Sequence, residues 1–279
     1  MLKLIHRTSP LAILICALML MQLIGCSEDA DDDDDADVTE APLLPPDGSM
    51  TVDLSTFNED GVQQSPAAAQ ATYLNFTNAV ARVKTINSAI VAASASPAAL
   101  FAAARLYEPE LQDDGSWLWS FSVQIDSVMF TAKLTGLTAT DITYWSMKVS
   151  TDAVLYPVTD FEWYKGTSGK LNTTGTWEFF DMKTPDEQNP TTKIDWSVKI
   201  LKEEAQLTIE NVDSRSEYFG DVLRYNATLE DASLSFDDAS KGETWEILWD
   251  ILGVGSIQVP GYKNGEKACW DAFKQDMEC

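Results

Sequence analysis

Alternating apolar and polar residues are the feature that most constrains how this chain folds. From Trp117 to Ile125 every odd position is apolar, while Ser120, Ser122 and Gln124 occupy even positions. Successive side chains of a strand point to opposite faces, so this period of two predicts a strand with one buried face. The same pattern recurs in later segments, giving about ten expected strands: 130–134, 143–149, 161–163, 177–179, 194–200, 207–209, 225–229, 234–236 and 245–249.

Short segments rich in turn residues connect these strands. Lys165–Gly169 and Asn172–Gly175 are typical of turns, and Gly253–Ser256 indicates a bend or a close approach of strands. Because no helical pattern interrupts the strands, we expect neighbours in sequence to pair antiparallel in a meander. A long meander leaves two unpaired edges unless it curls. We therefore expect a mainly β domain curled into a barrel or half-barrel, with a β-sandwich as the alternative.

Helices are expected on both sides of the strands. Ser65-Pro66 and Ser96-Pro97 each resemble a helix N-cap followed by proline at the first helical position. Apolar residues recur at helical spacing after both, which predicts two α-helices within residues 66–107. Lys267–Lys274 also has a helical pattern and predicts a short C-terminal helix. Residues 49–279 are thus expected to form a single β-rich domain.

The first 26 residues are typical of a secretory signal. Lys3 and Arg7 precede the apolar run Leu11–Met21, which is too short to span a bilayer because a spanning helix needs about 20 apolar residues. The sequence Leu23-Ile24-Gly25-Cys26 resembles the lipobox of bacterial lipoproteins. The resemblance implies cleavage by signal peptidase II after residue 25, a diacylglyceryl group on the sulfur of Cys26, and acylation such as palmitate on the new amino terminus. An ordinary signal peptide is the alternative, but no Ala-x-Ala-like site lies nearby.

Residues 26–48 are expected to form a disordered acidic spacer. They include the run Asp31–Asp35 and then Pro42, Pro45 and Pro46, and such a segment cannot bury a core. Ser27 after the lipidated cysteine resembles the sorting pattern of outer-membrane lipoproteins. Acidic runs at this place also resemble surface-export signals of Bacteroidetes-type bacteria. We therefore expect a lipid-anchored protein of the outer membrane, on its periplasmic face or on the cell surface.

The net charge limits the partners. The chain has 19 Lys and Arg against 44 Asp and Glu, a formal net charge of −25. Nucleic acid is an unsuitable partner because phosphate binding requires clustered basic residues. The expected partners are the membrane, reached through lipid on Cys26, and a lipid or glycan ligand. The sequence leaves the oligomeric state open.

Two cysteines remain after Cys16 leaves with the signal and Cys26 is lipidated. Exported proteins usually pair such cysteines, which favours a disulfide between Cys269 and Cys279. Ten residues of straight helix would place their Cα atoms ~15 Å apart. A disulfide needs them within about 7 Å, so either the helix stops and the chain folds back or the bond is not made.

Histidine occurs once, as His6 in the signal. This excludes Ser-His and Cys-His nucleophiles and histidine metal sites from the mature chain, and we expect no metal, cofactor or catalytic residue. A pair of carboxylates acting as a glycosidase is the less favoured catalytic alternative. Its candidates lie among aromatic residues: Glu162, Glu178, Asp181, Glu243, Glu246 and Asp250.

Nine tryptophans lie between residues 117 and 270. Most should be core residues, but several clusters point apolar groups to both faces of a strand, so a curled sheet could bind an apolar, lipid-like ligand. Stacking on glycans and a scaffold role in an envelope complex are the alternatives. The candidate ligand-binding residues are Trp117, Trp119, Trp145, Trp163, Trp177, Trp245 and Trp249.

Overall fold

One antiparallel sheet contains every strand that the structure describes. The structure is a computed structural model that describes residues 40–57, 72–125, 127–153, 157–187, 189–199 and 204–279. Fourteen strands follow one another across the sheet in chain order, which confirms the antiparallel meander. They are β1 (Glu110–Leu111), β2 (Trp117–Ile125), β3 (Val128–Ala139), β4 (Ile142–Thr151), β5 (Val158–Gly169), β6 (Thr174–Phe179), β7 (Thr192–Lys199), β8 (Glu204–Asn211), β9 (Val222–Ala227), β10 (Asp231–Asp238), β11 (Glu243–Asp250), β12 (Gly255–Gln258), β13 (Ala268–Trp270) and β14 (Asp276–Met277).

The ten strands expected from the alternation are β2 to β11. The four additional strands are two to four residues long and show too few alternating positions to be recognised in the sequence. The expected turn at Lys165–Gly169 is wrong, because these residues continue β5 and pair with β4 on one side and β6 on the other.

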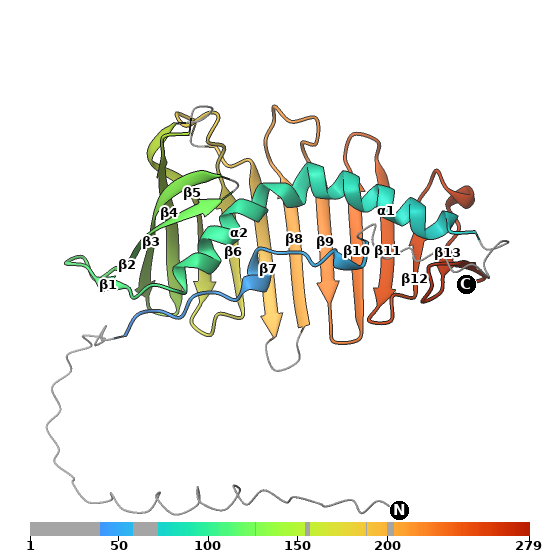
Figure 1. The fold of residues 1–279 in the computed structure, drawn as a ribbon, viewed down its shortest axis with the longest axis horizontal. Coiled ribbons are helices and arrows are strands. Elements are labelled where there is room, and N and C mark those ends of the chain that lie inside the picture. Colours follow the sequence, from blue (N-terminus) through green and yellow to red (C-terminus); the bar gives the residue numbers. More distant parts are fainter. Residues whose placement is uncertain (1–39, 58–71, 126, 154–156, 188, 200–203) are drawn as a thin grey trace, which may run out of the picture. The chain divides into compact units, whose positions relative to one another are not determined.

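The sheet is open and is not closed into a barrel (Figure 1). Within the described residues, β1 pairs only with β2 and β14 pairs only with β13. A second sheet, as in a sandwich, is also absent from this part of the chain. The reason is that helices, rather than another sheet, cover the apolar face, and very short strands form both edges.

Two helices joined without a break run across one face of the sheet (Figure 1). They are α1 (Leu74–Ile86) and α2 (Ala92–Ala104), and a π-helical turn (Asn87–Val91) connects them. The expected cap at Ser65-Pro66 lies outside the described residues. The expected helix start at Ser96-Pro97 is wrong, because α2 begins at Ala92 and contains Pro97. None of the helices in the described ranges is long and apolar enough to cross a bilayer.

Buried aromatic rings join the helices to the sheet. Phe101 of α2 lies 5.4 Å from the ring of Trp177 and 6.2 Å from that of Trp145, measured between centroids. Phe76 of α1 lies 5.6 Å from Trp270 in the same edge-to-face manner. Such pairs are favourable beyond the area they bury, so the helices are an integral layer of the core.

The C-terminal segment is a hairpin rather than the expected helix. β13 and β14 pair through Cys269↔Met277, and the amide of Lys274 bonds to the carbonyl of Asp271 in the turn between them. Cys269 and Cys279 are disulfide-bonded with Cα atoms 5.2 Å apart. The chain therefore folds back, and this resolves the geometric conflict that a helix would have created.

Residues 40–48, at the end of the expected spacer, contact the domain. The side-chain amide of Asn172 donates to the carbonyl of Leu43, and Arg105 pairs with Asp47 at 3.0 Å. The 3-10 helix Asp47–Ser49 follows, with Ser49 fully buried, and a second one spans Ser55–Phe57.

Candidate functional site

A groove lined by both apolar and polar residues lies at a split in the sheet, where the pairing of β5 with β6 ends. β5 pairs with β4 almost along its whole length, but it pairs with β6 only from Tyr164 to Ser168. The register between β4 and β5 shifts at Met147/Lys148, so Trp163 has no partner in β4. Such bulges redirect a side chain and bend a strand, and they are frequent beside functional sites.

The connection from β6 to β7 occupies this split. Its first residue, Phe180, donates a backbone hydrogen bond of 2.8 Å to the carbonyl of Trp163. Thr191, at its other end, donates through both its amide and its hydroxyl to the carbonyl of Phe179. The connection is therefore fixed to the sheet on both sides of the groove.

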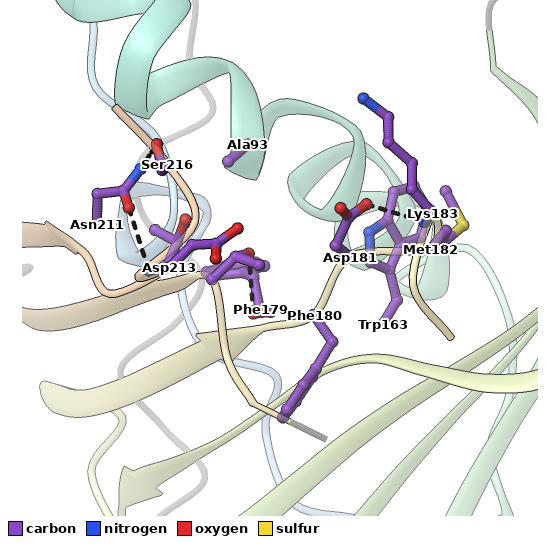
Figure 2. A pocket seen from close by; sticks show the side chains of 12 residues that line it. Ala93, Trp163, Phe179, Phe180, Asp181, Met182, Lys183, Asn211, Asp213 and Ser216 are labelled. Carbon is purple, nitrogen blue, oxygen red and sulfur yellow. Dashed lines mark hydrogen bonds between the residues drawn. The ribbon is translucent and has the colours of Figure 1, made fainter. Parts of the chain in front are cut away.

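Figure 2 shows the groove, which has a volume of about 370 Å³ and lies beside the start of α2. This volume is in the range of small-molecule sites. The apolar residues that line it are Ala93, Trp163, Phe179, Phe180 and Met182. The polar residues that line it, which we call the rim, are Asp181, Lys183, Thr191, Thr192, Asn211, Asp213 and Ser216.

Short hydrogen-bonded turns hold the rim in place. The carboxylate of Asp181 accepts a bond from the amide of Lys183 at 2.9 Å, and the side chain of Asn211 accepts one from the amide of Asp213 at 3.2 Å (Figure 2). The side chain of Asn211 also donates to the hydroxyl of Ser216 at 3.4 Å. Turns of this kind fix side-chain oxygens in loops, so the rim is preorganised.

Arg215 ties the two loops at the mouth of the groove. Its guanidinium donates to both carboxylate oxygens of Asp213, at 2.8 and 3.0 Å, and to Glu187 and Thr184 of the opposite loop. The hydrogen bond from Arg215 lowers the pKa of the Asp213 carboxyl. Asp213 is thus held ionised and is unsuited to donate a proton.

The seven candidate tryptophans do not meet at one site. Trp163 lines the groove just described, stacked on Phe130 with ring centroids 5.4 Å apart, and Trp249 lines a separate groove beside Asp231 and Gly255. Trp117 is half-buried. The other four lie buried on the face that the helices cover: Trp119, Trp145, Trp177 and Trp245.

The candidate carboxylates are also dispersed. Asp181 lies on the rim of the groove, whereas Glu178 pairs with Lys193 at 3.2 Å on the opposite face of the sheet. Asp250 accepts bonds from the amides of Leu252 and Val254 within a turn. The described residues contain no group of three Asp, Glu, Cys or His side chains that could hold a metal ion.

Several groove residues were not identified from the sequence. Met182, Asp213 and Ser216 lie in loops, where alternation gives no information, and Asn211 is the last residue of β8. The doublet Phe179-Phe180 breaks the alternation at the end of β6 and was the available signal, because two adjacent aromatic side chains of a strand cannot share one face. Searches of models of protein families, of curated proteins and of solved structures find no match to this chain.

Proposed function

We propose that this chain is an envelope lipoprotein, anchored through lipid on Cys26 to the outer membrane, whose domain binds the apolar part of a small amphiphile without catalysing a reaction. The observation that carries the binding proposal is the groove at the split in the sheet. An apolar lining with a few fixed polar groups is the usual composition of a small-molecule site. The lipobox-like sequence Leu23–Cys26 supports the anchor.

The ligand chemistry follows from the two parts of the groove. Ala93 and Met182, which are less buried than Trp163, offer most of the carbon surface. The rim carries Asp181, Asp213 and Lys183, so a headgroup with both a positive and a negative charge suits it better than an anion. The interface between helices and sheet is filled by rings such as Phe101, so the ligand site we propose is the groove and not that interface.

Glycan binding is the second candidate, and the rim favours it. Carboxylate, amide and hydroxyl groups converge there on aromatic side chains, as sugars require. Residues Trp163 and Phe180 are, however, only 8% and 6% exposed, which leaves little aromatic face for a sugar ring to stack on. The amphiphile is therefore the better fit.

Binding of lysophosphatidylcholine below its micellar concentration, followed by tryptophan fluorescence of the purified chain, tests the proposal. Ala93 borders the groove, and Ala93→Phe should fill it and weaken binding at least tenfold, about 1.4 kcal/mol. Ala81→Phe places the same ring on an exposed position of α1 outside the groove and should leave binding unchanged. Equal binding by both variants would contradict the site. A response to soluble polysaccharides that Ala93→Phe abolishes, with none to the lipid, would favour the glycan.

A further inference from the structure

The two ends of the sheet differ in what their turns expose. In a meander the turns alternate between the ends, so the turns that leave β5, β9, β11 and β13 lie at one end, the lower end in Figure 1. We name this the apolar end, because each of these turns carries an exposed leucine, isoleucine or phenylalanine. Including Leu43, the side chains are between 60% and 80% exposed: Leu43, Leu171, Leu229, Ile251, Leu252 and Phe273.

Hydrogen bonds join neighbouring turns of the apolar end. The amide of Ile251 donates to the carbonyl of Glu230 in the turn after β9, at 3.0 Å. The ammonium of Lys274, next to Phe273, donates to the carbonyl of Gly253 at 2.7 Å. These bonds place the turns after β9, β11 and β13 side by side. Leu229, Ile251, Leu252 and Phe273 therefore lie on neighbouring turns and are not single scattered positions, which are common on proteins.

The opposite end of the sheet is dominated by charge. Its loops carry residues such as Asp186, Glu187, Arg215 and Lys241, with Phe219 as an exposed apolar exception. The groove of the proposed function lies at this charged end, since Asp181, Lys183, Asp213 and Ser216 belong to the loops after β6 and β8. The apolar end also carries charge, such as the exposed pair Lys170–Asp141, so the two ends differ in the apolar residues that their turns expose and in the groove.

The described chain enters the domain at the apolar end. The side-chain amide of Asn172, in the turn after β5, donates to the carbonyl of Leu43, and Leu43 follows Cys26 by seventeen positions. Exposed Leu, Ile and Phe on turn tips suit the interface of a bilayer, where apolar side chains enter between headgroups. Acidic Glu230 beside Leu229 makes an anionic lipid surface unsuitable and leaves a zwitterionic one.

We propose that the apolar end is a membrane-contacting surface, at which Leu171, Leu229, Ile251, Leu252 and Phe273 insert into the headgroup region of a zwitterionic bilayer. The groove at the charged end then opens away from that bilayer. The proposal rests in part on the lipid anchor at Cys26 proposed above, since the anchor brings this end to the lipid.

An environment-sensitive fluorophore tests the contact in the full mature chain reconstituted into phosphatidylcholine vesicles. Leu252→Cys provides one free thiol, since Cys269 and Cys279 are bonded to each other. Glu217→Cys, on the exposed loop after β8, is the matched control at the charged end. Nitrobenzoxadiazole at residue 252 should shift its emission to shorter wavelength and be quenched by doxyl-labelled lipid, while the label at residue 217 should show neither effect.

Equal exposure of the two labels to water overturns the inference. Shielding of residue 252 before vesicles are added also overturns it, because a second copy or another protein would then cover the apolar end. Failure of the anchor is a separate result, seen as loss of flotation with the vesicles. The emission shift and doxyl quenching of the label at residue 252 decide whether the apolar end contacts the bilayer.

Discussion

Glycines opposite tryptophans let large rings lie flat on the sheet. Gly136 faces Trp145, Gly166 faces Trp177 and Gly175 faces Trp196 in register. A Cβ atom built on Gly136 would lie 2.7 Å from the ring of Trp145, and one on Gly175 would lie 2.6 Å from that of Trp196. The absent side chain thus makes room for an indole, an arrangement that compensates for the weak strand preference of glycine.

Gly175→Ala is therefore expected to destabilise the domain by about 1–3 kcal/mol, as overpacking of a buried site does. The added methyl group would meet both the ring of Trp196 and the carbonyl of Thr167. Urea unfolding followed by circular dichroism measures the change. Gly261→Ala is the control, because a Cβ there has no neighbour within 4 Å. Equal stability of the two variants would contradict the close approach.

Two neighbouring carboxyls have pKa values shifted in opposite directions. Burial, together with the negative charge of Asp238, raises the pKa of Asp221. Burial also acts to raise the pKa of Asp238, but hydrogen bonds from Lys241 and Ser240 outweigh it and lower that pKa. Folding therefore disfavours ionisation of Asp221 and favours ionisation of Asp238, each relative to the unfolded chain.

The opposite pKa shifts of Asp221 and Asp238 give opposite dependences of stability on pH. The ionisation of Asp221 lowers stability as the pH rises from its unfolded value of 3.8 through the raised folded pKa. Asp238 contributes stability above 3.8 that is lost as the pH falls through its lowered folded pKa. Asp221→Asn should stabilise the domain at pH 7, and Asp238→Asn should destabilise it. Both differences should shrink towards pH 3 in urea unfolding series, and a pH-independent difference for either variant would contradict the assignment.

At the scale of elements, the C-terminal strand holds the start of α1. Asp276 in β14 accepts hydrogen bonds from the amide of Asn75 at 2.8 Å and from the hydroxyl of Thr72 at 2.6 Å. Fully buried Asn75 donates to the carbonyl of Cys269 and accepts from the hydroxyl of Tyr262. The helix thus receives its N-terminal cap from a residue about 200 positions later in the chain.

Asp276→Ala should consequently lower the free energy of unfolding by about 1–2 kcal/mol, the usual effect of removing a helix cap. Hydrogen exchange of the amides of Leu74 and Asn75 should accelerate more than exchange in β7, because the loss is local. Glu278→Ala removes a nearby exposed carboxylate and should change neither quantity. If the amides of α1 exchange as in the unchanged protein, the cap does not hold the helix.

The elements show where sequence patterns suffice and where they fail. Strands β2 and β7 follow directly from their alternation, because each buries one face. Residues 267–274 have spacing that suits a helix as well as a hairpin. The disulfide from Cys269 to Cys279 and the positive φ of 66° at Lys274 fit a hairpin and not a helix, and apolar spacing carries no information on either. Ser96-Pro97 also has the local pattern of a helix start. The π-helical turn Asn87–Val91, through which the helix continues into Pro97, cannot be recognised from that pattern.

The candidate site was predictable only in part. The aromatic residues around Trp163 predict it as a ligand-binding residue, and Asp181 is a candidate because it is a carboxylate among aromatic residues. Their meeting with Asn211 and Asp213 depends on a bulge in β5 and on two loops tied by Arg215. Local periodicity carries no information on either, because loop positions are set by tertiary hydrogen bonds.

At the scale of the whole molecule, the proposed membrane attachment and the proposed ligand binding belong to different segments of the chain. The proposed anchor at Cys26 lies in the N-terminal segment, and the groove lies at the charged end of the sheet. In the described residues, the domain has its own buried core of aromatic and aliphatic side chains that begins at Met50, with Ala41 and Leu44 packed against it. Folding of the domain should therefore not require the lipid.

Cys26→Ala is expected to separate membrane attachment from folding and ligand binding in cells. The variant should lose most of its membrane association, because stable anchoring needs several acyl chains on one residue and the apolar end alone gives reversible contact. Its unfolding transition in urea and its binding of lysophosphatidylcholine should match those of the unchanged protein. Membrane fractionation with immunodetection, before and after a high-salt wash, provides the measurement. A variant that stays in the washed membrane fraction would show that something other than lipid on Cys26 attaches the chain, and altered urea unfolding would show that the anchor contributes to the fold.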